Sequence, residues 1–244
     1  MVHALRAASV LVFLLLWEWA ARVPISFNFP SPGATVAALG ALLGSGALIE
    51  ATLTSAQSLL LGFGAAALVG IPFGLVMGVV RPVGRVARIY VDLLIALPTA
   101  ALIPLIILSF GISVVSSAVI IFVFSAPFVI MNAYGGVRDV RPRLVEMARG
   151  FGASWRQIMA LVVLPSALPM ILAGLRYGLS RAFVGLIVAE LLLSPFGLGK
   201  LIMISRSMFE HDRMFATVLW TLLLAGAVLA GLARVEARLL RWRA

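Results

Sequence analysis

The stretch EMARGFGASWRQIMALVVLPSALPM, residues 146–170, separates two long apolar runs of the chain. Just before it, Pro142 suits the first position of a helix, because a proline there loses no hydrogen bond. The apolar side chains that follow recur at helical spacing and form one face: Leu144, Met147, Ala148, Phe151 and Trp155. Gly150 and Gly152 weaken the middle of the segment, and Pro165 is expected to end it. The sequence therefore predicts two short amphipathic helices joined by a bend.

We refer to residues 138–165, which contain both predicted helices and the bend, as the elbow. Two interpretations of the elbow are open on physical grounds. Its apolar face and its arginines can hold it on a lipid surface. Its apolar side chains can equally insert into a groove on a partner protein. An ordinary connecting loop is disfavoured, because most connections are a few residues long and lack a periodic apolar face.

The composition places the rest of the chain in a membrane. Of its 244 residues, 63% are hydrophobic and 11% are charged, with a mean hydropathy of +1.15, which leaves too little polar surface to cover a water-soluble globule. Apolar runs of about 20 residues predict helical spans and an all-α integral membrane protein. The lack of cysteine excludes disulfides, thiolate metal sites and a cysteine nucleophile, and only two histidines argue against a histidine-built metal site.

Six transmembrane helices are expected. Their approximate ranges are 4–21, 52–80, 89–110, 116–134, the run that follows Pro165 up to about 193, and 214–233. The first run has features of a cleaved signal peptide, but the tryptophans in WEWAAR, residues 17–22, match an interfacial belt and favour a retained helix. The string FPSPGAT, residues 29–35, predicts a turn-rich loop after it.

The net charge of +10 reflects membrane topology rather than a nucleic-acid partner, because the basic residues lie between and beyond the apolar runs. Twelve arginines fall on one side of the predicted topology: Arg81, Arg85, Arg88, Arg138, Arg141, Arg143, Arg149, Arg156, Arg234, Arg238, Arg241 and Arg243. The opposite side has few basic residues: Arg22, Lys200, Arg206 and Arg213. The positive-inside rule therefore places the elbow and both termini in the cytoplasm.

Small residues recur every fourth position in the second span, at Ala66, Gly70, Gly74 and Gly78. Such a ridge lets two helix backbones approach closely. A contact within the subunit and a seam between two copies of the chain are both compatible with it.

Charges and prolines inside the spans mark candidate pathway or gate residues. Arg176 and Glu190 fall in the fifth span, where charge is expensive, and lie too far apart along the helix to pair. Arg176 is expected to snorkel to the cytoplasmic interface, while Glu190 is either a gate, a partner for an arginine of another helix, or a satisfied interface carboxylate. Pro98 and Pro104 interrupt the third span, and broken backbone at membrane depth can line a cavity; a simple kink is the alternative.

The elbow resembles the EAA loop of ABC-importer permeases, in which Glu-Ala-Ala is followed by a glycine, an aliphatic residue and Leu-Pro. The matching positions are Glu146, Ala148, Gly152, Val162, Leu164 and Pro165, with Met147 in place of the second alanine. Further strings, among them GIPFGLVMG at 70–78, are similar to the nitrate/sulfonate/taurine branch of these permeases. The chain departs from that branch at Leu102, where a tryptophan is frequent, and at Ser58, where an arginine is frequent.

This resemblance implies a type I ABC-importer permease fold in the bacterial inner membrane, working in binding-protein-dependent import of a small anionic solute such as a sulfonate or nitrate. It implies that the elbow docks into a groove on a cytoplasmic ATPase. The implied ATPase-coupling residues are Glu146, Ala148, Phe151, Gly152, Leu164 and Pro165. The implied partners are two ATPase subunits, a periplasmic or lipid-anchored substrate-binding protein and a second permease copy in a homodimer, surrounded by membrane lipid.

The chain itself is expected to be neither an enzyme nor a cofactor-binding protein, with ATP and Mg²⁺ on the partner ATPase. The string nearest to a phosphate-binding loop, SPFGLGKL at 194–201, lacks the first glycine and the Ser or Thr after Lys200. An ion-coupled secondary transporter is the alternative function, although the sequence shows no convincing repeated halves. The expected parts are a transmembrane helix and outer loop at 1–50, a permease core with the elbow at 51–235, and a basic cytoplasmic tail at 236–244.

Overall fold

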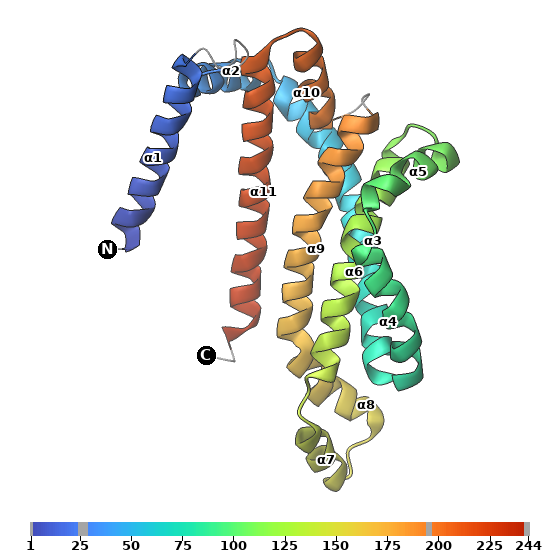
Figure 1. Ribbon diagram of the computed structural model, residues 1–244. Helices are drawn as coiled ribbons and strands as arrows, with labels where there is room; N and C mark the ends of the chain where they lie inside the picture. Colours follow the sequence, from blue (N-terminus) through green and yellow to red (C-terminus); the bar gives the residue numbers. More distant parts are fainter. Residues whose placement is uncertain (1, 24–28, 194–196, 242–244) are drawn as a thin grey trace. The chain divides into compact units, whose positions relative to one another are not determined.

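The computed structural model describes residues 2–23, 29–193 and 197–241 (Figure 1). The elements are α1 (Val2–Arg22), α2 (Pro32–Gly44), α3 (Ala47–Val79), α4 (Arg81–Ala96), the 3-10 helix η1 (Thr99–Leu102), α5 (Ile103–Phe110), α6 (Val114–Arg138), α7 (Pro142–Gly150), α8 (Trp155–Ile158), the π-helical segment η2 (Met159–Val163), α9 (Leu164–Leu193), α10 (Gly197–Ser207) and α11 (His211–Leu239). These ranges contain helices and no strand, so the predicted all-α class is confirmed.

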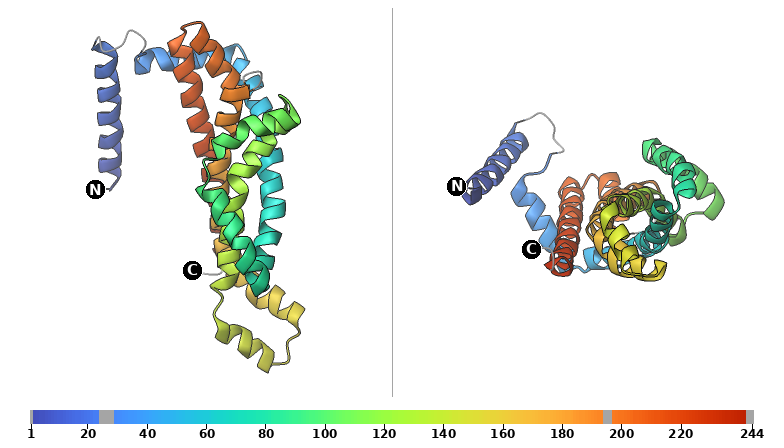
Figure 2. Two further views of the ribbon diagram at one scale, coloured as in Figure 1. Left: turned by 45° about the vertical axis from the view of Figure 1, so that its right-hand side comes forward. Right: turned by 90° about the horizontal axis from the view of Figure 1, so that it is seen from below.

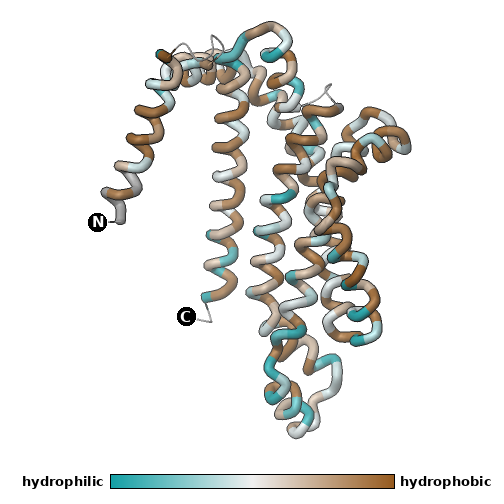
Figure 3. The backbone as a smooth tube through the Cα atoms, in the orientation of Figure 1, coloured by the Kyte–Doolittle hydropathy of each residue, from teal (hydrophilic) through white to brown (hydrophobic). Residues whose placement is uncertain are grey.

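Four helices in the described ranges are long and apolar enough to cross a membrane: α3, α6, the continuous helix Trp155–Leu192 and α11. They overlap the predicted second, fourth, fifth and sixth spans, and Figure 3 shows apolar residues along them. Helix α1 covers the predicted first span with 21 residues, and its crossing of the membrane stays a prediction.

The third span is bent rather than a single run over 89–110. Helix α4 begins earlier, at Arg81, and the pair formed by α4 and the segment Thr99–Phe110 bends by 92°. Pro98 accounts for the break, because a proline disfavours helical backbone in the residue before it, and Leu97 is extended with a ψ of 140°. The prediction that Pro104 also interrupts the span is wrong, because Pro104 lies in the first turn of α5, where a proline is tolerated.

The segment after α1 is more ordered than the turn-rich loop expected over residues 29–35. Ser31 accepts a hydrogen bond from the backbone N–H of Ala34 at 3.2 Å and so caps a helix that starts at Pro32. The predicted loop treats Pro32 and Gly33 as turn residues. However, a serine followed by a proline, as at Ser31 and Pro32, is also typical of a helix start. Helix α2 was therefore missed.

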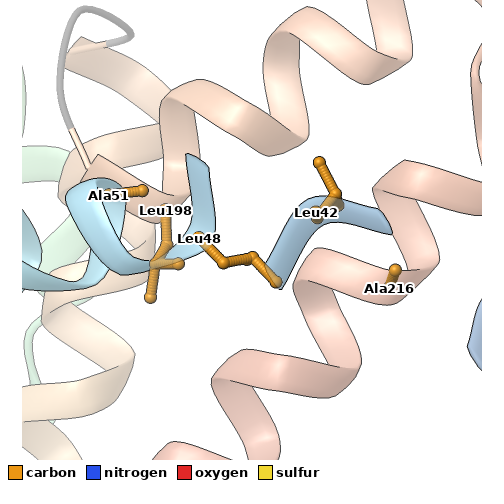
Figure 4. Close-up of a cluster of buried hydrophobic side chains, with 5 residues drawn as sticks. All are labelled: Leu42, Leu48, Ala51, Leu198 and Ala216. Carbon is orange, nitrogen blue, oxygen red and sulfur yellow. The ribbon is translucent and has the colours of Figure 1, made fainter. Parts of the chain in front are cut away.

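The contacts divide the chain into two compact units, Met1–Ser55 with Glu190–Leu224, and Ala56–Ala189 with Ala225–Ala244. In the first unit, α2, α3, α10 and α11 enclose a small apolar core made of Leu42, Leu48, Ala51, Leu198 and Ala216 (Figure 4). The indole N–H of Trp220 on α11 donates to the hydroxyl of Thr52 on α3 at 2.9 Å. These contacts hold the first turns of α3 to α11.

In the second unit, α6 packs between α3 and α9 through glycines (Figure 2). A Cβ atom on Gly74 of α3 would lie 2.5 Å from the carbonyl oxygen of Ile130, and one on Gly78 would lie 2.5 Å from the Cβ of Val137. On the α9 side, a Cβ on Gly178 would lie 2.6 Å from a methyl group of Val129. The small-residue ridge of the second span therefore makes a contact within the subunit, which decides between the two interpretations given above.

We expect Gly74→Ala to lower the midpoint of thermal unfolding in detergent by several degrees, because the added methyl group would overlap the backbone of α6. Gly64→Ala in the same helix is the matched control. Its Cβ would meet nothing within 4 Å, so it should keep or slightly raise the midpoint. Equal effects of the two substitutions would contradict the close α3–α6 contact.

Candidate functional site

The bend of the elbow is built by the end of α7. Gly152 has a φ of +77°, a left-handed conformation that favours glycine. The N–H of Gly152 donates to the carbonyl of Arg149 at 2.9 Å, and the N–H of Ala153 donates to that of Ala148 at 3.0 Å. This pair of bonds is a Schellman motif, which satisfies the last carbonyls of α7. The predicted bend between two short helices is confirmed, and a Cβ on Gly152 would meet nothing within 4 Å.

The start of the second elbow helix is capped on both sides. The hydroxyl of Ser154 accepts from the N–H of Gln157 at 3.4 Å, while the side-chain oxygen of Gln157 accepts from the N–H of Ser154 at 2.7 Å. This capping box orients α8 relative to the bend. The elbow is thus a defined structure with both of its inner helix ends satisfied.

Pro165 does not end the second helix of the elbow, contrary to the prediction. The chain stays helical from Trp155 to Leu192, and the π-helical segment Met159–Val163 lies directly before the proline. The N–H of Leu164 donates to the carbonyl of Met159, five residues back. This wider turn relieves the clash that a proline ring makes with the carbonyl four residues earlier. Helix α8 therefore continues into α9 without an interruption of the helix.

The tip of the elbow presents apolar side chains that nothing in the described structure covers. Phe151 is 86% exposed, and Met147 and Trp155 are more than half exposed. Ala148 is half-buried, and the side chain of Glu146 is exposed in the second turn of α7. Glu146 lies beyond the first turn of α7, so the helix dipole contributes little to the stability of its carboxylate.

The remaining two coupling candidates lie where the elbow enters the fifth span. Leu164 is 37% exposed, and Pro165 is half-buried in the first turn of α9. Figure 1 shows α7 and α8 at one end of α6 and α9, away from the long helical runs of the second unit. Chemically, the elbow offers an aromatic and aliphatic tip flanked by arginines, with two exposed carboxylates, those of Asp139 and Glu146.

Arg176 is paired, and its partner was not foreseen. Its Nη1 lies 3.1 Å from Oε2 of Glu236 on α11 in the second unit, and the carboxylate side chain is 17% exposed. Glu236, which belongs to the predicted basic C-terminal tail, thus neutralises the charge of Arg176 in the fifth span. The guanidinium of Arg181 lies 4.8 Å from the centre of the Phe128 ring, a cation–π contact with α6.

Glu190 is a buried, hydrogen-bonded carboxylate of the first unit. Its Oε1 accepts from the hydroxyl of Ser55 on α3 at 2.6 Å, and its Oε2 accepts from the N–H of Gly199 at 2.9 Å. The Ser55 oxygen in turn accepts from the N–H of Leu198 at 2.9 Å. Of the three expected roles, the satisfied carboxylate is the one observed. The partner is not an arginine but the first turn of α10, whose N–H groups attract negative charge.

The glycines of SPFGLGKL are explained by this carboxylate. A Cβ on Gly197, which has a φ of +67°, would lie 2.2 Å from Oε1 of Glu190, and one on Gly199 would lie 2.4 Å from its Cβ. The sequence contains the two glycines, Gly197 and Gly199, on either side of Leu198. No pattern in the sequence links them to Glu190 or Ser55. Residues 194–196 of the string lie outside the described residues.

Comparison with known proteins gives a consistent assignment. A family model described as "Binding-protein-dependent transport system inner membrane component" matches residues 70–241. The chain is 33% identical to the "Putative aliphatic sulfonates transport permease protein SsuC" of Bacillus subtilis, covering 88% of this chain and 78% of that one. It is 30% identical to the taurine transport system permease protein TauC of Escherichia coli, covering 98% and 89%. It is 32% identical to the riboflavin transport system permease protein RibX of Chloroflexus aurantiacus, covering 96% and 89%.

Solved structures show the same fold at low identity. A permease chain of the MetNI methionine ABC transporter in an inward-facing conformation aligns with a TM-score of 0.62 at 19% identity, covering 76% of this chain and 94% of that one. An amino acid ABC transporter solved with histidines aligns with a TM-score of 0.60 at 19% identity, covering 83% and 97%. These alignments confirm the type I ABC-importer permease fold.

Proposed function

This chain belongs to the family of binding-protein-dependent transport system inner membrane components, and on that premise we propose that its elbow couples it to a partner ATPase. The chain is a multi-pass permease subunit of an ABC importer, related over most of its length to sulfonate and taurine permeases. The observation that carries the coupling proposal is the exposure of Phe151 on an otherwise ordered bend. An aromatic side chain held rigidly in the open is suited to fill a pocket on a protein partner.

Transmission follows from the continuous helix that starts at Trp155. When two partner ATPase subunits, which bind ATP and Mg²⁺, close on each other, they draw α7 and α8 with them. Because no break separates α8 from α9, this movement displaces the cytoplasmic half of the fifth span as a rigid lever. The two positions of the lever correspond to two states of the permease, which ATP binding and hydrolysis bias in turn. The chain itself performs no hydrolysis.

The partners and topology complete the proposal. A substrate-binding protein delivers the solute to the side opposite the elbow, and a second copy of this chain forms the other half of the path. The arginine-rich elbow and both termini lie in the cytoplasm, as the positive-inside rule requires. The remaining pathway candidate is the broken backbone at Pro98, because the 92° bend interrupts helical hydrogen bonding at membrane depth.

The substrate is proposed to be a small organic anion of the sulfonate class. The support comes from relatives named for aliphatic sulfonates and taurine. The relative named for riboflavin, at similar identity, makes riboflavin the comparison substrate. An ion-coupled transporter gains no support from Glu190, whose oxygens are engaged by Ser55 and Gly199.

Isolation of the tagged chain from its host membranes in mild detergent tests the coupling proposal. We expect an ATPase subunit to co-purify at one copy per permease chain and to hydrolyse ATP. Addition of the binding protein loaded with taurine or an alkanesulfonate should stimulate that hydrolysis, whereas the unloaded binding protein should stimulate it less. Isolation of the chain without any ATPase would refute the coupling proposal, and stimulation by riboflavin alone would refute only the substrate class.

A further inference from the structure

Four arginines of the second unit surround a pocket of about 220 Å³ where α3, α4 and α6 meet. The lining residues are Met77, Arg81, Arg85, Arg88, Tyr134 and Arg138. The corner is tightly built, because a Cβ on Gly84 would lie 2.3 Å from the carbonyl oxygen of Met77 and 3.2 Å from the Tyr134 ring. The backbone of the α3–α4 turn therefore holds the arginines of α4 beside α6.

The pocket carries an excess of positive charge. Asp92 neutralises one of the four arginines, because it forms an ion pair with Arg88 at 3.3 Å, in which both side chains are half-exposed. Asp139 follows Arg138 at the end of α6 but does not line the pocket. No carboxylate is among the described lining residues, so three guanidinium groups face it without an acidic partner there. Such a pocket favours an anion that accepts several hydrogen bonds, as a phosphate does.

An exposed apolar stripe begins next to the arginines on the same helix. Arg85, Ile89 and Leu93 follow one another at four-residue spacing, which places them in one row along α4. Val86 and Tyr90 widen the row, and all four apolar side chains are more than half exposed. A charged pocket that continues into an apolar stripe matches the chemistry of a phospholipid, with a phosphate at one end and acyl chains running from it.

We propose that this pocket binds the phosphate headgroup of an anionic phospholipid, with the acyl chains lying along the α4 stripe. A soluble anion would use the arginines but would leave the stripe unexplained, and for this reason the lipid is the better occupant. The predicted topology places the pocket at the cytoplasmic leaflet, where arginines at the membrane surface attract anionic headgroups. The bound lipid holds the α3–α4 turn against α6, at the end of α4 opposite the break at Pro98.

Native mass spectrometry of the detergent-purified permease, together with any subunits that co-purify, tests the proposal. Wild type is expected to retain phosphatidylglycerol in preference to phosphatidylcholine. The double variant Arg81→Gln/Arg85→Gln should bind phosphatidylglycerol about 25-fold more weakly, at about fivefold for each arginine near the membrane surface. Its affinity for phosphatidylcholine should not change. Inorganic phosphate at millimolar concentration should not displace the lipid.

The matched control is Arg234→Gln/Arg238→Gln, which removes two exposed arginines of α11 from the same predicted side. An equal loss of phosphatidylglycerol affinity in this control would show that the effect comes from general surface charge, and it would overturn the proposal. Unchanged phosphatidylglycerol affinity in Arg81→Gln/Arg85→Gln would also overturn it, as would displacement of the lipid by inorganic phosphate. If the double variant does not fold, Arg85→Gln alone makes the same test with a fivefold expected loss.

Discussion

Replacing Phe151 by alanine is expected to leave the fold intact but to weaken the complex with the ATPase by about 30-fold, or about 2 kcal/mol, the usual effect of truncating a central aromatic anchor. The side chain is 86% exposed in the isolated chain, so its removal takes almost no packing away. The thermal midpoint should therefore match that of wild type. The measurement is the dissociation constant of the ATPase for the detergent-solubilised permease.

Leu108→Ala is the control for this substitution, because Leu108 of α5 is 85% exposed and lies outside the elbow. It should change neither the midpoint nor the affinity for the ATPase. Glu146→Ala should weaken the complex as well, since Glu146 has no ion pair within the described chain and remains available to a donor on the partner. Wild-type affinity in Phe151→Ala would favour the lipid-surface interpretation of the elbow instead.

Glu190→Ala is expected to destabilise the permease by on the order of 3 kcal/mol, because it leaves the buried Ser55 hydroxyl and the Gly199 N–H without their acceptor. For a chain of this length, that corresponds to a fall of about 6 to 12 °C in the thermal midpoint. Glu190→Gln keeps an acceptor oxygen and the side-chain volume, so it should lose less than half as much. The midpoint in detergent measures both.

Gly197→Ala supplies an independent test of the same network. The added methyl group would overlap the Glu190 carboxylate and would also require a positive φ in a residue with a side chain. We expect a loss similar to that of Glu190→Ala. Gly40→Ala in α2 is the matched control, because its Cβ would meet nothing within 4 Å. If both Glu190→Ala and Gly197→Ala melt like wild type, the carboxylate does not hold α10.

The sequence predicted the parts of the fold that depend on local patterns. Apolar length predicted the helices α3, α6 and α11 and the core of α9, because crossing a membrane requires a run of that length. The bend at Gly152 followed from two glycines in an amphipathic segment. The close approach of α3 followed from its small residues, although only the structure could name α6 as the partner.

The features that the sequence did not predict depend on three-dimensional context. Pro165 continues a helix because a π-helical turn precedes it, and the sequence alone does not show where such a turn forms. The partners of Arg176 and Glu190, namely Glu236 and Ser55, lie 60 and 135 residues away along the chain. Contacts at such separations leave no periodic pattern in one sequence. Helices α2 and α10 are too short and too rich in glycine to stand out from loops.

The most direct test of the central claim is solute uptake into vesicles that contain the permease and its ATPase, with substrate-loaded binding protein outside and ATP inside. We predict taurine or alkanesulfonate accumulation that requires ATP, is lost with a hydrolysis-deficient ATPase, is strongly reduced in Phe151→Ala and persists when ionophores collapse all ion gradients. Uptake by vesicles that contain the permease alone, driven by an ion gradient and abolished by ionophores, would contradict the account and would identify a secondary transporter.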